Sequence, residues 1–479
     1  MTTDRTVDDV LSRLLALRAD DLPTHGGRTL AYVYDSGIAE ADTLGREALA
    51  AYGATNGLDP TAFPSLLAME RDLVAFARPL FHAPPTAVGT VTSGGTESIL
   101  LAVQTARDAH PDVARPVMVV PTTIHAAFHK AAHYFGVERV SVPVDPQTFR
   151  ADPASMVAAL ETYADRVVLV AASAPSYAHG VVDPIPQIAS AAAARGVRFH
   201  VDACIGGWVL PWLERDGLVA TPWDFAVEGV TSISADLHKY AYTPKGVSLL
   251  LHRTPQLRRP QFFASADWPG YTMLNATMQS TKSGGPLAAA WAVVSYLGDE
   301  GYHVLARRAY DGTRALAAGV AEIAHLRSAS APDTTLVAVS TDEACDVFTI
   351  SDAMLDRGWF VQPQMAYGEL PPTLHLTVSA ATADLVPEFL NTLRDAVTEA
   401  VATGPVVIDP QLRAAAQALD PATLDDAAFD GLLALAGLAG DDGAVGVPAR
   451  MAPVNALLDV APPALREALM VAFLDRLTR

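Results

Sequence analysis

Between residues 87 and 251, short apolar runs alternate with segments whose apolar residues recur at helical spacing. The runs have the length of strands, and the segments between them are long enough for helices. This alternation is typical of an α/β fold with a mostly parallel sheet and helices on both faces. Seven strands are expected, at 87–91, 117–120, 139–144, 167–172, 198–201, 232–235 and 247–251, with helices at 99–108, 125–135, 153–163 and 184–195.

The flanking regions have other patterns. Residues 7–18 predict an amphipathic helix that packs on something else, such as a partner subunit, because their leucines recur at helical spacing. From about Tyr302 a helix leads to a smaller α/β region and an Ala- and Pro-rich tail. We therefore predict an N-terminal segment (1–60), a large domain (61–305) and a small C-terminal domain (306–479). Further helices are expected at 43–52, 63–81, 286–297, 384–402 and 463–477, strands at 336–339 and 374–378, and a flexible loop at 437–446.

Composition narrows the functional classes. The 479-residue chain is half hydrophobic and carries a formal net charge of −20, which argues against nucleic-acid and anionic-membrane partners. Cys204 and Cys345 form no CxxC pattern, so a disulfide scaffold is not expected and a reducing cytoplasm fits. No signal-peptide pattern is visible, and no apolar run reaches the roughly 18 residues of a membrane span.

A glycine-containing segment, Ser93-Gly94-Gly95-Thr96, follows the first expected strand and precedes a helix. Glycines let the backbone approach an anion, and a helix N-terminus offers free N–H groups and partial positive charge. The segment therefore suits a phosphate, to which the hydroxyls of Ser93 and Thr96 would add donors. The alternative is an ordinary turn in which Thr96 caps the helix.

Two ionisable residues lie where strands are expected to end. Asp202 ends the run that starts at His200, and a buried carboxylate there needs a partner, such as a protonated pyridine nitrogen. Alternatively, it caps the next turn. Lys239 lies in the corner between the last two strands and can form an imine with an aldehyde cofactor if it faces a cavity. The alternative is a surface lysine on a loop.

Three histidines, His125, His129 and His133, recur every four residues along one expected helix. No H-E-x-x-H pattern and no added ligand at fixed spacing accompanies them, so we predict no metal site. His125 could instead stack on a flat cofactor ring from the start of the helix. A phosphate cradle, a stacking histidine, a ring-nitrogen carboxylate and an imine-forming lysine are together what pyridoxal 5'-phosphate (PLP) requires.

Four stretches closely resemble sphingosine-1-phosphate lyases, which are fold-type-I PLP enzymes of the group II decarboxylase branch. The resemblance extends from about Gly27 to Ala400, and it implies a homodimer with active sites at the subunit interface. The four stretches are Thr90–Leu100, His125–Phe128, His200–Cys204 and Ser232–Gly246.

The resemblance implies a role for each matching residue. Lys239 would bond to the cofactor, Asp202 would pair with the pyridine nitrogen, and His125 would stack on the ring. Lys245 and Tyr177 would join Lys239 in catalysis. The remaining cofactor-binding residues would be Ser93, Gly94, Gly95, Thr96, Ala203, Ser234 and His238, with a partner-subunit segment around Ser280–Gly285, and the substrate side would include Tyr34, Asn56, Asp59 and His129.

The chain departs from the family pattern near the expected substrate phosphate. Family members read Asn-Pro-Leu-His where this chain reads Asn56-Gly57-Leu58-Asp59, and Asp59 would repel a phosphate. The family's Gly-Ser-Arg is replaced by Ser280-Thr281-Lys282, and His129 stands where Asn is usual. Whether the substrate is phosphorylated therefore stays open.

The expected activity is cleavage of a 2-amino-3-hydroxy substrate into an aldehyde and an amine. One alternative is an amino-acid decarboxylase, which would need a group that binds the substrate carboxylate, and the sequence identifies none. Another is a PLP-binding scaffold without turnover. The presence of Lys239, Asp202 and Lys245 argues against the scaffold.

Overall fold

The computed structural model describes residues 6–59, 61–435, 448 and 450–478. Its largest element is a seven-stranded sheet with the strand order β1-β7-β6-β5-β4-β2-β3. Strands β2 to β6 pair in parallel, whereas β7 is antiparallel to β1 and β6, so the expected mostly parallel sheet is confirmed. The strands are β1 (Val88–Thr92), β2 (Val117–Pro121), β3 (Glu138–Val142), β4 (Val167–Ser173), β5 (Arg198–Asp202), β6 (Val230–Asp236) and β7 (Ser248–His252).

Helices cover both faces of this sheet, as the alternation of patterns predicts. Successive side chains of a strand point to opposite faces. Val119 of β2 packs in one core with α6 (Pro153–Tyr163) and α7 (Ile185–Ala193). The next residue, Val120, packs in another core with α4 (Gly95–Asp108) and α5 (Ala127–Phe135). The strands are therefore buried on both faces, which explains their continuous apolar runs.

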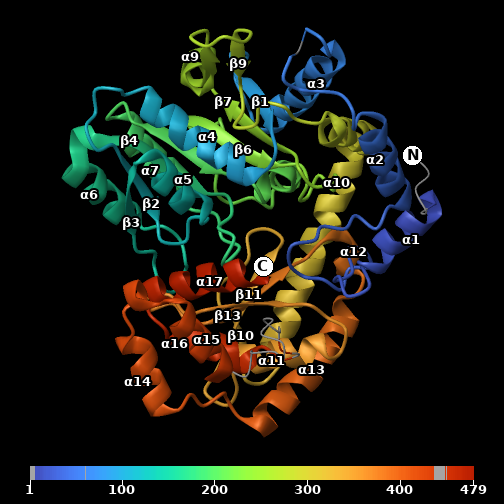
Figure 1. Ribbon diagram of the computed structural model, residues 1–479, viewed down its shortest axis with the longest axis vertical. Helices are drawn as coiled ribbons and strands as arrows, with labels where there is room; N and C mark the ends of the chain where they lie inside the picture. Colours follow the sequence, from blue (N-terminus) through green and yellow to red (C-terminus); the bar gives the residue numbers. More distant parts are fainter. Residues whose placement is uncertain (1–5, 60, 436–447, 449, 479) are drawn as a thin grey trace.

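A smaller antiparallel sheet, with the order β10-β11-β13-β12, lies below the large sheet in Figure 1. It packs against α11 (Val347–Leu355) and α13 (Val386–Thr403) around buried side chains such as Trp359 and Phe389. This confirms the smaller C-terminal α/β region. Its strands are β10 (Leu326–Ser328), β11 (Leu336–Thr341), β12 (Gln362–Gln364) and β13 (Thr373–Thr377).

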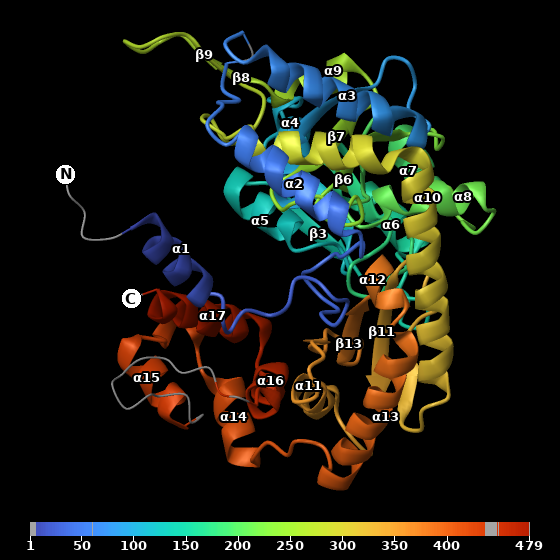
Figure 2. The same cartoon turned by 90° about the vertical axis from the view of Figure 1, so that its right-hand side faces the viewer.

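One long helix, α10 (Gly285–Ala321), connects the two sheets, and Figures 1 and 2 show it running from one to the other. The sequence patterns suggest two separate helices here, and the helical backbone does break at Gly298, so that α10 consists of two helical segments that meet at a kink. This residue has φ 59° and ψ −172°, a conformation available essentially only to glycine. The expected domain boundary at residue 305 lies inside α10.

The remaining elements surround these two sheets. α1 (Val7–Ala16), α2 (Ala39–Ala51) and α3 (Pro64–Leu80) form the N-terminal part. The closing helix is confirmed as α17 (Pro463–Leu477), and the expected loop at 437–446 lies outside the described residues. Among the described helices, none is both long and apolar enough to cross a bilayer. The other elements are α8 (Leu210–Arg215), α9 (Pro255–Arg258), β8 (Phe263–Ser265), β9 (Met273–Asn275), α12 (Ala380–Ala383), α14 (Pro410–Ala418), α15 (Asp426–Leu435) and α16 (Ala452–Val460).

Candidate active site

The carboxyl ends of two adjacent parallel strands, β5 and β6, carry the acids of the site. Asp202 ends β5 and pairs in register with Ser234 of β6, and Asp236 ends β6 two residues later. The pairing continues one residue beyond β5, where the backbone N–H of Ala203 donates to the Ser234 carbonyl at 3.0 Å. The two carboxylates therefore lie at the edge of the sheet where α/β proteins bind their ligands.

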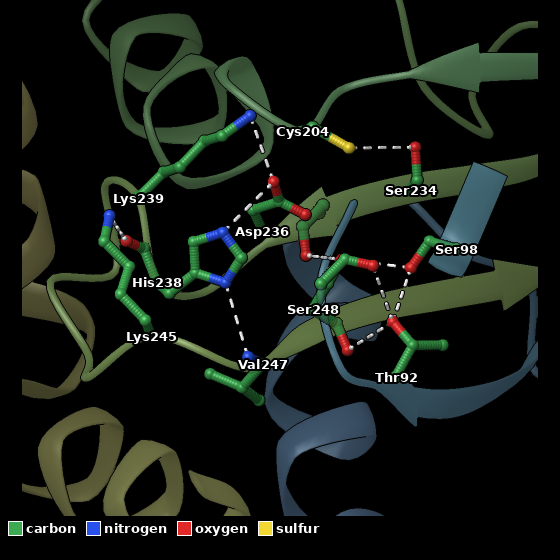
Figure 3. A network of polar contacts seen from close by, with 12 residues as sticks. Thr92, Ser98, Cys204, Ser234, Asp236, His238, Lys239, Lys245, Val247 and Ser248 are labelled. Atoms are coloured by element: carbon green, nitrogen blue, oxygen red, sulfur yellow. Dashed lines mark hydrogen bonds and ion pairs between the residues drawn. The ribbon is translucent and has the colours of Figure 1, made fainter. Parts of the chain in front are cut away.

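Lys239 follows β6 and points back toward Asp236. Its ammonium nitrogen lies 3.0 Å from Oδ2 of Asp236, and Nε2 of His238 lies 3.6 Å from the same oxygen (Figure 3). Burial alone would lower the pKa of Lys239, but the charge of Asp236 and weaker neighbouring charges outweigh it and raise the pKa. Lys239 is therefore enclosed and held in place, as the imine-forming role requires, and is not a surface lysine.

Asp236 is a site residue that the sequence pattern alone did not indicate. Its side chain is almost fully buried, and Oδ1 has no hydrogen-bond partner among the described residues. Burial alone would raise the pKa of Asp236, but Lys239 and His238 hold it below its ordinary value. The signal was available, because an acid at the end of a buried strand three residues before a buried lysine needs that lysine as its partner.

The segment Ser93–Thr96, which the sequence suggests as a phosphate site, leads into the start of α4 next to this ion pair. Gly94 has φ 151°, and a side chain on Gly95 would lie 2.7 Å from both oxygens of Asp236. Only glycine at position 95 lets the helix N-terminus approach the carboxylate so closely. The side chains of Ser93 and Thr96 are exposed beside it, so their hydroxyls can contact a ligand.

Glu97 organises the same segment and was also missed. Its buried carboxylate accepts the N–H of Ser93 at 2.6 Å and the N–H of Met278 at 2.7 Å. The carboxylate thus links the Ser93–Thr96 segment to the loop after β9 by hydrogen bonds.

His125 and Tyr177 are two rings near the ion pair. Asp202, Lys239 and Asp236 lie close enough to His125 for their charges to act on its pKa. Loss of hydration lowers the pKa of His125, so its ring is neutral at neutral pH. Tyr177 meets His125 edge-on, with ring centroids 6.4 Å apart and an interplanar angle of 88°. Burial raises the pKa of Tyr177 to about 12, so its phenol keeps its proton.

Lys245 and Tyr34 form a further contact near Lys239. The ammonium of Lys245 lies 4.9 Å above the Tyr34 ring and donates to the carbonyls of Tyr32 at 2.9 Å and His238 at 3.3 Å. Although the residue is exposed, loss of hydration lowers its pKa to about 8, and the charge of Lys239 acts in the same direction. Tyr32 is a further residue that the sequence did not reveal, because it acts through its backbone carbonyl.

Three candidate substrate residues lie apart from this cluster. His129 accepts a hydrogen bond from Arg139 at 2.6 Å, and loss of hydration together with that cation lowers its pKa to about 4. Asp59 is exposed and accepts from the N–H and hydroxyl of Thr61. Asn56 bridges to Ser283. The adjacent Gly57 and Leu58 line a separate hollow of about 570 Å³ with Lys282.

The residues present fit PLP. The N-terminus of α4 presents the exposed hydroxyls of Ser93 and Thr96 to a phosphate, and Oδ1 of Asp236, which has no hydrogen-bond partner among the described residues, marks a polar space beside Lys239. Oδ1 of Asp202 is fixed by the N–H of Cys204 at 3.1 Å and the hydroxyl of Ser234 at 3.4 Å. The Asp202 carboxylate is therefore held in a fixed orientation at the end of β5, and a carboxylate there suits a protonated ring nitrogen.

Fold and site together define a PLP-dependent lyase. The family described as "Pyridoxal-dependent decarboxylase conserved domain" matches residues 32–341, and "Pyridoxal-dependent enzyme, C-terminal putative HTH domain" matches residues 410–476. The chain is 36% identical to a sphingosine-1-phosphate lyase of Arabidopsis thaliana, over 79% of this chain and 70% of the relative. It is 34% identical to sphingosine-1-phosphate lyase 1 of Rattus norvegicus, over 82% and 68%.

Solved structures agree with these relatives. The sphingosine-1-phosphate lyase of Burkholderia pseudomallei superposes with a TM-score of 0.77 at 33% identity, over 84% of this chain and 93% of that one. A glutamate decarboxylase of Lactobacillus brevis, with a TM-score of 0.74 at 20% identity, shares the fold. The chain belongs to the sphingosine-1-phosphate lyase family of PLP-dependent enzymes, which confirms the resemblance seen in the sequence.

Proposed function

We propose that this protein cleaves the C2–C3 bond of a 2-amino-3-hydroxy substrate of the sphingosine-1-phosphate type, releasing an aldehyde and an amine. The observation that carries the proposal is the second amine in the pocket. Lys245, with a pKa of about 8, lies close enough to Lys239 for the two charges to interact. A general base with a pKa near the working pH suits removal of a hydroxyl proton.

When bound, PLP supplies an electron-poor ring that accepts the electron pair released by the broken bond. Lys239 would hold the cofactor through its amine, Asp202 would pair with the ring nitrogen, and His125 would lie against the ring. The phosphate would be bound at the N-terminus of α4 by Ser93, Gly94, Gly95 and Thr96, with Ala203, Ser234 and His238 as further cofactor-binding residues.

Two side chains move protons in the proposed reaction. The neutral amine of Lys245 takes the proton of the C3 hydroxyl, the C3–O bond becomes a carbonyl, and the C2–C3 bond breaks. The phenol of Tyr177 then gives a proton to C2, because burial keeps it protonated at neutral pH. Lys245 and Tyr177 exchange their protons with solvent before the next turnover.

We further propose that the enzyme is a homodimer whose Asn56, Asp59 and His129 serve the substrate side of the active sites. All ten residues of α1 are exposed, although a helix this short is marginal alone in water. The β8–β9 hairpin projects from the body in Figure 2 and exposes Phe263 and Leu274. Exposed apolar groups of this kind mark an interface.

The dimer is tested by light scattering on the holoenzyme. We expect the mass of two chains, and a shift toward one chain when Phe263 and Leu274 are both replaced by serine. A wild-type mass of one chain refutes this part of the proposal.

Two buried free cysteines, Cys204 and Cys345, lead us to propose a reducing, cytoplasmic location.

The activity is tested with holoenzyme and two substrate sets. Long-chain 2-amino-3-hydroxy compounds, with and without a 1-phosphate, should release a fatty aldehyde that a hydrazine reagent traps. Amino acids should release no CO2. The reverse result would establish the decarboxylase, and no product from either set would favour the scaffold.

A further inference from the structure

The smaller sheet contributes a ring to the active site that the proposed mechanism has not yet used. His375 of β13 is fully buried and stacks on Tyr177, with ring centroids 4.1 Å apart and an interplanar angle of 24°. Its Nε2 pairs with the hydroxyl of Thr377 at 2.9 Å, which fixes the ring orientation. Burial lowers the pKa of His375 to about 3, so the ring is uncharged at neutral pH.

Tyr177 is therefore held from two directions. His375 covers one face of the phenol, and the edge contact with His125 restrains it from the cofactor side. The residues after β13 also hold the segment that carries Lys239. Tyr240 donates to the Val378 carbonyl at 3.0 Å, and the Ala380 N–H donates to the Tyr242 hydroxyl at 3.2 Å. One strand and its continuation thus support two catalytic segments of the large sheet.

We propose that His375 is a positioning residue that holds the phenol of Tyr177 flat against β13, so that its hydroxyl meets the reacting carbon. The proposal rests on the proton-donor role of Tyr177 given above. A flat ring stacks face to face on the phenol and restrains its tilt more closely than an aliphatic side chain can. Displacement of a catalytic group by about 1 Å can cost on the order of a hundredfold in rate.

A matched pair of variants separates positioning from packing. His375→Phe keeps a flat ring, whereas His375→Leu fills similar space without one. We expect His375→Leu to lower kcat about tenfold to a hundredfold with little change in KM, and His375→Phe to restore most of that loss. The visible absorbance of bound PLP should stay as in the wild type, because Lys239 and Asp202 are untouched.

The chain offers a control for packing alone. His252 is also buried, pairs with Gln261 at 3.1 Å, and lies at the opposite end of β7 from Ser248, the residue that pairs with Asp236. His252→Leu should therefore lower the melting temperature without the kcat loss of His375→Leu. Equal kcat losses in the two leucine variants would overturn the proposal.

A double-mutant cycle with Tyr177→Phe tests the coupling directly. If His375 acts through the phenol, His375→Leu should cause no further loss of kcat in the Tyr177→Phe background. If His375→Leu lowers kcat by the same factor in both backgrounds, the positioning role is overturned. If Tyr177→Phe keeps full kcat, the positioning role also fails, but continued aldehyde release would leave the proposed function intact.

A milder variant covers the case in which His375→Leu does not fold. Thr377→Val removes the hydroxyl that orients His375 and keeps the side-chain volume. We expect a smaller loss of kcat that again disappears in the Tyr177→Phe background. Unchanged kcat in Thr377→Val, together with poor folding of His375→Leu, would assign His375 to packing alone.

Discussion

The ammonium of Lys239 lies 3.0 Å from the carboxylate of Asp236 and is held in its charged form. Only the neutral amine can attack an aldehyde, so this ion pair opposes covalent attachment of the cofactor at low pH. We predict that Asp236→Asn moves the pH midpoint for recombination of apoenzyme with PLP downward by about one unit or more.

The measurement follows the visible absorbance of PLP after mixing with apoenzyme at several pH values. Lys239→Ala is the control, because it has no amine to attach and should show neither the absorbance band nor turnover. A midpoint for Asp236→Asn at or above that of the wild type would contradict the role given to the ion pair.

Asp202 is expected to act through its charge. Asp202→Ala and Asp202→Asn should both keep part of the bound PLP, through the α4 cradle and Lys239, but lose about a hundredfold or more in kcat. Retention is measured by absorbance after gel filtration, and turnover by aldehyde release. Near-normal kcat in Asp202→Asn, which keeps the shape and loses the charge, would refute this assignment.

The base role of Lys245 predicts a direction for the pH profile. A base works when deprotonated, so kcat should rise as pH increases through about 8, the pKa that loss of hydration gives this amine. Lys245→Gln should lose this rise and much of the activity. The exposed Lys130 offers a control, because Lys130→Gln should leave the profile unchanged. A rise near pH 8 that survives in Lys245→Gln would assign it to another group.

Asp59 is predicted to disfavour phosphorylated substrates. Asp59 is exposed, so solvent screens its charge and the repulsion of a phosphate is modest. Asp59→His should therefore raise kcat/KM for the phosphorylated amine relative to the unphosphorylated one by a few fold. Asp59→Asn isolates the loss of charge from the gain of an imidazole. An unchanged ratio in both variants would show that Asp59 does not sense the phosphate.

The large sheet could be predicted from sequence because its strands are buried on both faces. The all-apolar run of β4 and the helical spacing of α6 leave little ambiguity. Helix starts were less accurate. α5 begins at Ala127, two residues after the expected start, because His125 lies before the helix and accepts the Ala127 N–H.

The candidate site could be predicted only where one short segment carries the chemistry. Ser93–Thr96, Asp202 and Lys239 each lie at the end of a strand, so their convergence follows from the sheet. His375 could not be found in this way, because it comes from the other sheet, 198 residues after Tyr177. The kink at Gly298 agrees with the sequence pattern, because glycine within an apolar helical pattern usually marks a break.

Helix α10 also bears on how the protein unfolds. The segment after the kink contributes Leu305 and Ala309 to the core of the large sheet and Leu316 and Val320 to the core of the small one. Melting either core would remove packing partners of this one continuous segment. Heat capacity should therefore show a single cooperative transition, and the catalytic pocket should be lost in that same event.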